Sequence, residues 1–255
     1  MKAIGNQLVF DNPWNIVGVC SLMDKQRTLE KNKLSISTKI YAALFLMLLV
    51  YLAVQAVLSG IVYLKQYQVN TAIEQWYEYD QQPSLAEWEA MESLILSAMD
   101  GNEEITTLLY VTGRLYDFRS VIIAGSWEEK LFYGQKSIAY YKQLIQRRPA
   151  WPHGWMNFAV AKARLGELDD EFKNALFQLL KTGPWEKNTR PFLIQLSLLS
   201  WSVLDANERR LLTDYFIIAQ ERRTWGVYQA VTSFGRLGLY CSIVTQEGAK
   251  AKFCK

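Results

Sequence analysis

Apolar residues form one long uninterrupted run near the N-terminus of the chain. Residues 40–64 contain no charged side chain, and Lys39 and Lys65 stand at the two ends of the run. As a helix, about 25 residues rise about 37 Å, which is enough to cross a bilayer core of about 30 Å with some tilt. The apolar region of a cleaved signal peptide is shorter, about 7–15 residues. The pattern therefore predicts one retained transmembrane helix over residues 40–64.

The charges on the two sides of this run differ, and the difference predicts an orientation. Segment 1–39 is basic, whereas every charged side chain between Lys65 and Arg114 is acidic. The positive-inside rule places a basic tail, 1–39, in the cytoplasm and residues 66–255 on the far side of the membrane. We therefore expect a protein with one span and a C-terminal domain outside the cytoplasm, which is the periplasm if the cell has two membranes. Met23 is a second plausible start, in which case residues 1–22 would not belong to the native chain.

Beyond the span, apolar residues recur with helical spacing between recognisable helix starts and stops. Three pairs have the spacing of a capping box, Ser84 with Glu87, Ser126 with Glu129 and Asp205 with Glu208. The predicted helices cover residues 85–99, 103–124, 127–148, 152–165, 168–182, 189–204, 205–223 and 226–242. No segment has the alternation of a strand. We expect an all-α domain over 66–245, a stack of antiparallel helical hairpins, followed by a loose polar tail, 246–255.

The spacing around Pro149 is similar to that of a tetratricopeptide repeat (TPR). Ser137-x3-Tyr141, Leu144 and Pro149 resemble a second repeat helix and its closing proline. Trp155-x2-Phe158-Ala159 and Gly166 resemble the first helix and turn of the next repeat. Lys162 departs from the tyrosine usual at its position. We expect a degenerate TPR-like fold over about 84–240, with a generic helical bundle as the alternative.

Residues 147–241 also resemble the VpsP-like polysaccharide-biosynthesis proteins. The resemblance rests on the run from Arg148 to Leu176, on Gly183-Pro-Trp-Glu186 and on Phe234-Gly-Arg236 ahead of Cys241. Members of that family are small inner-membrane proteins encoded with exopolysaccharide machinery in Gram-negative bacteria. The resemblance implies a pathway, the production of matrix (biofilm) or capsule polysaccharide, and no particular reaction.

Charge and composition narrow the partners of the predicted outer domain. The chain has 255 residues, 28 basic and 25 acidic, with a net charge of +3. Segment 1–65 holds seven of the basic and three of the acidic residues, which leaves 21 and 22 in the remainder, a net charge of −1. A domain this close to neutral lacks the dense basic stripe that displaces counterions from nucleic-acid phosphates, so we expect no nucleic-acid partner.

Motifs for catalysis, metal binding or cofactor binding do not emerge from the sequence. His153 is the only histidine, and no nucleophile elbow, P-loop or Gly-x-Gly-x-x-Gly occurs. The acids 169–171 suit the positive start of a helix better than an acid–base pair. We therefore predict no metal site, no cofactor and no enzymatic activity. Cys241 and Cys254 would share an oxidising compartment, and either a disulfide or two free thiols remains open.

The candidate binding residues lie on and near the predicted helix 152–165. In a TPR-like register, His153, Met156, Val160, Ala163 and Arg164 would point into a concave groove that is mildly apolar with one cation. Flat rings beside charged groups suit a sugar face or a partner's peptide, although the same rings suit core packing. The candidates are His153, Trp155, Met156, Val160, Lys162, Arg164, Trp185 and Glu186.

Three functions remain open at this stage. We favour a membrane-anchored adaptor that binds a protein partner, and through it a polysaccharide polymerisation or export complex, by way of the helical-repeat groove. The first alternative is a periplasmic carbohydrate-acting enzyme with two converging carboxylates. The second is a general periplasmic assembly chaperone.

Overall fold

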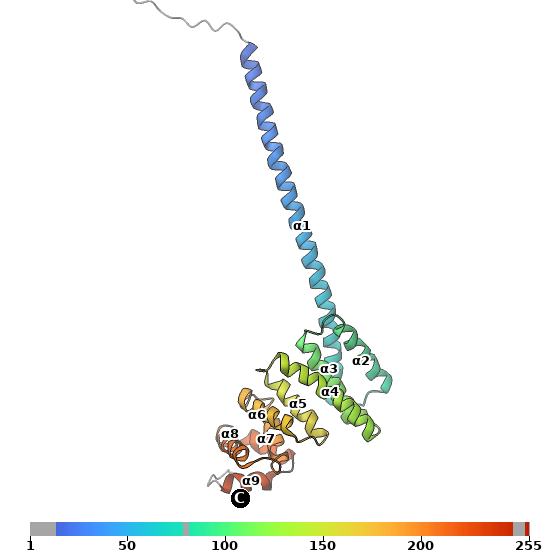
Figure 1. The fold of residues 1–255 in the computed structure, drawn as a ribbon, viewed down its shortest axis with the longest axis vertical. Helices are drawn as coiled ribbons and strands as arrows, with labels where there is room; N and C mark the ends of the chain where they lie inside the picture. The colour runs from blue at the N-terminus through green and yellow to red at the C-terminus, as the bar shows by residue number, and fades with distance from the viewer. Residues whose placement is uncertain (1–13, 79–81, 247–252, 255) are drawn as a thin grey trace, which may run out of the picture. The chain divides into compact units, whose positions relative to one another are not determined.

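The computed structural model describes residues 14–78, 82–246 and 253–254, and this part of the chain is helical, without strands (Figure 1). The chain divides into two units, Met1–Ile61 and Val62–Lys255. We call the second the helical unit. The prediction of an all-α protein is confirmed.

The first helix, α1 (Trp14–Glu78), contains the apolar run. Every side chain from 36 to 61 is exposed, including the large apolar ones. An exposed apolar surface of this length needs an apolar environment to cover it. Of the described residues, Ile36–Glu78 is the one helical stretch long and apolar enough to cross a membrane. This stretch is a candidate membrane span and includes the predicted residues 40–64.

The last turns of α1, residues 62–78, belong to the helical unit. Val69 and Ile73 are fully buried there, in a cluster that includes Trp88 and Leu115. No helix was predicted for this segment, because its two buried apolar residues stand among polar ones. The helical unit therefore begins with the end of α1.

Of the next three α-helices, the first and the third begin at the predicted residues. In chain order, the elements are α2 (Leu85–Met99), α3 (Thr106–Phe118), a π-helical turn η1 (Arg119–Ile123) and α4 (Trp127–Arg147). At α2 the capping box forms, with the Glu87 N–H donating to Ser84 Oγ at 3.2 Å and the Ser84 N–H donating to Glu87 Oε2 at 2.7 Å. The predicted helix 103–124 is corrected at both ends. It starts three residues late, without a side-chain cap, and its last turn widens into η1, where the Ala124 N–H donates to the Arg119 carbonyl.

The remaining helices are α5 (Pro152–Arg164), α6 (Asp170–Thr182), α7 (Arg190–Leu199), α8 (Ala206–Ser233) and α9 (Leu237–Gln246). Three predicted boundaries are wrong. Helix α7 ends at Leu199 rather than 204. Helix α8 does not end at Arg223, although Arg223 has non-helical angles (φ −146°, ψ 50°), and it runs on to Ser233. Gly235, with φ +68°, separates α8 from α9, so 226–242 is not one helix.

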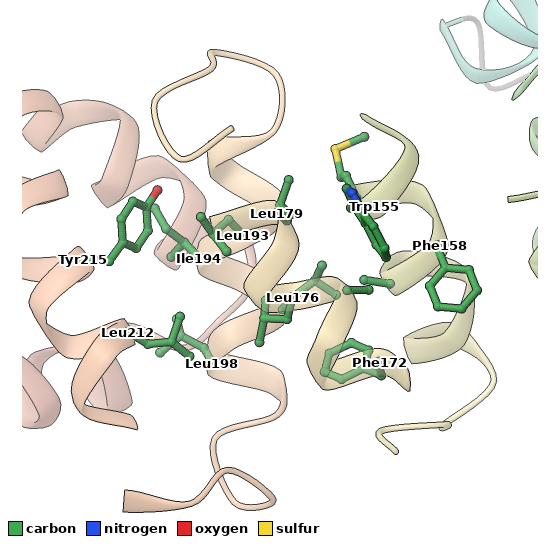
Figure 2. Close-up of a cluster of buried hydrophobic side chains, with 14 of the residues drawn as sticks. Trp155, Phe158, Phe172, Leu176, Leu179, Leu193, Ile194, Leu198, Leu212 and Tyr215 are labelled. Atoms are coloured by element: carbon green, nitrogen blue, oxygen red, sulfur yellow. The ribbon is translucent and has the colours of Figure 1, made fainter. Parts of the chain in front are cut away.

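Helices that follow one another in the chain pack against one another in the helical unit (Figure 1). Helix α3 lies along α4, α5 along α6, and α7 along α8, and α5 also contacts α4 and α7. Figure 2 shows the shared core, in which Phe172 and Leu176 of α6 lie between α5 and the side chains of α7 and α8. Burying a leucine or phenylalanine in this way stabilises a fold by about 1.5–3 kcal/mol. The apolar stripes therefore join the helices into one core-bearing unit.

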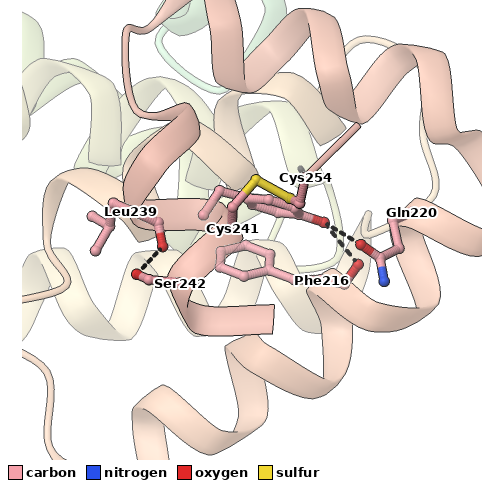
Figure 3. Close-up of a disulfide and its surroundings, with 7 residues drawn as sticks. Phe216, Gln220, Leu239, Cys241, Ser242 and Cys254 are labelled. Atoms are coloured by element: carbon pink, nitrogen blue, oxygen red, sulfur yellow. Dashed lines mark hydrogen bonds between the residues drawn. A yellow bond between two sulfur atoms is a disulfide. The ribbon is translucent and has the colours of Figure 1, made fainter. Parts of the chain in front are cut away.

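The C-terminal end of the described chain is tied to α9. Cys241 and Cys254 form a disulfide with Cα atoms 5.4 Å apart (Figure 3). Phe253 packs on Tyr240 and Tyr228, with ring centroids 5.8 and 5.4 Å apart. The expectation of a loose tail over 246–255 is therefore wrong for residues 253–254, because a covalent bond and two ring contacts hold them. Residues 247–252 and 255 lie outside the described residues.

Candidate functional site

A groove between the facing sides of α5 and α7 brings together several predicted residues and several that were not predicted. Its volume is about 270 Å³. Val160, Ala163 and Arg164 line it from α5, Phe192, Gln195, Leu196 and Leu199 from α7, and Phe234 from the turn after α8. We call this the α5–α7 groove.

Helical spacing explains how the two walls form. On α5, positions 163 and 164 stand three and four residues after position 160. On α7, positions 195 and 196 stand three and four residues after 192, and 199 stands four after 195. Residues with this spacing share one helix face, and α5 and α7 are in contact. Six of the eight lining residues are apolar, so the groove offers apolar side chains rather than charge.

The cation of the groove, Arg164, is neutralised by a carboxylate from α3. Arg164 Nη1 pairs with Asp117 Oδ2, and this ion pair ties α3 to α5. Burial raises the pKa of Asp117, although the nearby Arg164 and Arg114 guanidinium groups oppose that change. Arg114 in turn donates to Asn70 Oδ1 of α1 at 2.6 Å. The polar end of the groove is thus part of a side-chain network that crosses α1, α3 and α5.

No model of a known protein family matches this chain, and no curated protein sequence matches it. Within the described residues, no three His, Cys, Asp or Glu side chains come together as they would around a metal ion. The geometry of the helical unit is therefore the basis for assigning a function.

Two of the predicted groove residues lie elsewhere. Met156 is buried in the core with 7% of its surface exposed. It shares the helix face of Val160 and Ala163 but lies one turn earlier, where the core covers that face. His153 lies at the start of α5, where its Nε2 is 3.3 Å from Glu186 Oε1 and its ring is 5.6 Å from that of Trp151. His153 and Glu186 thus link α5 to the turn before α7 and are not part of the α5–α7 groove.

Trp155 and Trp185 have different surroundings. Trp155, labelled in Figure 2, is 9% exposed. It donates from Nε1 to the Pro149 carbonyl at 2.7 Å, which fixes the ring at the corner between α4 and α5. Trp185 is 40% exposed, and its ring lies 5.5 Å from that of Tyr215. Of the two indoles, only Trp185 presents much of its surface to solvent.

Lys162 is buried within a cluster of acidic side chains. Its side chain is 4% exposed, and Nζ lies 2.9 Å from Glu167, 3.0 Å from Asp169 and 3.6 Å from Glu171. Burial alone would lower the pKa of Lys162, but hydrogen bonds to Glu167 and Asp169 outweigh burial, and the pKa is raised. This ammonium group joins the end of α5 to the start of α6, and it has no position in the groove.

The α7 wall of the groove was not predicted. Phe192, Gln195 and Leu199 belong to a helix that was predicted, and their spacing places them on one face. The partner of that face depends on how two hairpins pack, which spacing within one helix does not reveal.

Proposed function

We propose that this chain is a membrane-anchored adaptor that binds a protein partner in the α5–α7 groove. The observation that carries the proposal is the groove itself, an open apolar surface built from the facing sides of two helices. A short amphipathic segment with apolar side chains would bury them there, as in other helix-lined grooves. The neutralised Arg164 favours such a segment over a polyanion.

A degenerate TPR-like arrangement is part of this proposal. Helices α3, α5 and α7 are the first members of three successive hairpins, α5 contacts α7, and the Arg164–Asp117 pair joins α5 to α3. In a stack of helical hairpins, such a row of first helices forms one continuous binding surface. The contacts support this arrangement without requiring regular repeats.

The membrane topology that we propose has the N-terminus in the cytoplasm, one span within α1 and the helical unit in the periplasm. The basic residues before the apolar run support this orientation. The Cys241–Cys254 disulfide supports it independently, because disulfides persist in oxidising compartments. A C-terminal alkaline phosphatase fusion should be active and a C-terminal green fluorescent protein fusion dark. The reverse pattern would rule out the periplasmic placement.

The partner that we propose is a component of exopolysaccharide polymerisation or export. The support for this step is the resemblance of residues 147–241 to VpsP-like proteins, and it concerns the pathway alone. A photo-crosslinking residue at Val160 should capture such a membrane protein in native membranes. The control carries the photo-crosslinking amino acid at position 211 instead. Leu211 is 55% exposed on α8 and does not line the groove.

A charge placed in the groove tests the binding surface directly. Ala163→Glu adds a carboxylate among apolar walls, and we expect it to lower partner capture at least tenfold, because a buried unpaired charge is costly. Ala206→Glu makes the same change at an exposed position on α8 and should leave capture unchanged. Equal capture by both variants, or equal crosslinking at Val160 and Leu211, would contradict the proposal.

A further inference from the structure

Three arginines and one tryptophan line a second pocket in the helical unit, separate from the α5–α7 groove. The pocket has a volume of about 330 Å³ and is lined by Trp185, Arg190, Arg222 and Arg223. Trp185 stands in the turn before α7, Arg190 is the first residue of α7, and the other two lie where α8 departs from helical angles. We call it the arginine pocket.

The backbone of α8 makes room for one of these arginines. A Cβ atom on Gly226 would lie 3.0 Å from Arg190 Nη2 and 3.6 Å from its Cζ. Because glycine has no side chain, the Arg190 guanidinium can lie against α8 at this point. Arg190 is thereby held next to Arg222 and Arg223, which come from the preceding turn of α8.

The positive charges of the pocket have no acidic partners in the part of the chain that the structure describes. None of the three arginines forms an ion pair there. Glu186, next to Trp185 in sequence, contacts His153 instead. Arg222 lies over the Trp185 ring at 4.6 Å, and Arg190 Nε is buried without a hydrogen-bond partner. A buried donor left without a partner is costly, and an anion bound nearby would offset that cost.

We propose that the arginine pocket binds an anionic oxygen group, a phosphate or a carboxylate, of a small ligand such as a sugar phosphate or a uronic acid. Guanidinium groups donate paired hydrogen bonds that match the two oxygens of a carboxylate or phosphate. The volume is at the lower end of the range of small-molecule sites, and Trp185 supplies the one apolar wall. The pocket and its ligand are independent of the partner proposed for the α5–α7 groove.

Calorimetric titration of the full chain in detergent micelles tests this site. The probes are glucose 1-phosphate, glucuronate, inorganic phosphate and glucose. We expect heat of binding from the three anions and none from glucose. Inorganic phosphate as tight as glucose 1-phosphate would identify the anion alone as the recognised group, and tighter binding of the sugar anions would add a contact to the ring. Both outcomes support the site.

Two exposed arginines provide the variants, because their replacement leaves the core intact. Arg222→Gln and Arg223→Gln should each weaken anion binding about tenfold, since each removes charge-assisted hydrogen bonds. Arg210→Gln, at an exposed position on the same helix, makes the same charge change outside the pocket and should leave binding unaltered. The proposal is overturned if no anion binds at millimolar concentration, or if anion binding survives when Arg222→Gln and Arg223→Gln are combined. It is also overturned if Arg210→Gln weakens anion binding as much as either pocket variant does.

Discussion

Replacing Lys162 with methionine should destabilise the helical unit although it leaves the core shape almost unchanged. Methionine retains an unbranched stem of similar length, with sulfur in place of the δ-methylene, and lacks the ammonium group. The lost interactions are two hydrogen bonds, 2.9 Å to Glu167 and 3.0 Å to Asp169, and a longer ion pair with Glu171 at 3.6 Å. We expect Lys162→Met to lower the free energy of unfolding by about 2–3 kcal/mol at pH 7.

The expected loss in unfolding free energy follows from the burial of Lys162 and the partial exposure of the acidic side chains around it. Hydrogen bonds to charged groups contribute about 1.5–3 kcal/mol each, which would total about 3–6 kcal/mol for two. The side chains of Glu167 and Asp169 are 29% and 53% exposed, so water stabilises their carboxylates when Lys162 is removed. Solvent screening therefore places the loss at or below the lower end of that range.

The loss of stability caused by Lys162→Met should become smaller as the pH falls. Burial tends to raise the pKa of Asp169, but hydrogen bonds from the Phe172 N–H and from Lys162 outweigh it and lower that pKa. A lowered carboxylate pKa contributes stability at neutral pH that disappears as the pH falls through the folded-state value. The difference between wild type and variant should therefore shrink below about pH 4. The raised pKa of Lys162 keeps the difference constant up to about pH 10.

Urea unfolding of the full chain in detergent, followed by tryptophan fluorescence, measures this loss. Eight of the nine tryptophans lie between 76 and 225, so the signal reports on the helical unit. Lys142→Met is the matched control, because Lys142 bonds Glu171 of the same cluster at 2.5 Å but is half-exposed. It should cost about 0.5 kcal/mol or less. A loss no greater for Lys162→Met than for Lys142→Met, or one that persists unchanged at pH 3, would refute the reasoning.

Two further predictions concern stability and use the same unfolding measurement. Gly113→Ala should cost about 1–3 kcal/mol, because its Cβ would lie 2.6 Å from the buried Tyr141 ring and force it to move; an unchanged midpoint would show that the ring moves freely. Reducing the Cys241–Cys254 disulfide, or Cys254→Ser, should cost about 3 kcal/mol, since the bond closes a loop with a sequence separation of 13. If reductant leaves the unfolding of the Cys254→Ser variant unchanged but shifts that of the wild type, the effect belongs to this bond.

Local signals predicted the starts of the helices better than their ends. Helix α2 begins and ends where Ser84, Glu87 and Asp100 predict, because a capping box is made by residues within one turn. The end of α8 was missed for a different reason. Gly226 was predicted to start a new helix, yet it lies inside α8 with Arg190 of α7 against it. A glycine that breaks an isolated helix can instead make room for a neighbouring one.

The candidate site shows the same difference between features set within one helix and features set by contacts between helices. Spacing within α5 grouped His153, Met156, Val160, Ala163 and Arg164 on one face, and the structure places the last three in the α5–α7 groove. The sequence also contained the apolar run of α1 and the pair of cysteines near the C-terminus. These features depend on residue type and on short-range geometry, which the chain carries before it folds.

The tertiary structure alone decided which charged groups meet. Lys162, a candidate binding residue from the sequence, lies at the centre of an acidic cluster. Arg164 pairs with Asp117 from another hairpin, and the arginines of α7 and α8 line one pocket. Residues on different helices approach one another according to how the hairpins pack. Helical periodicity describes the faces of each helix, whereas the neighbour of each face is set by the core of the whole unit.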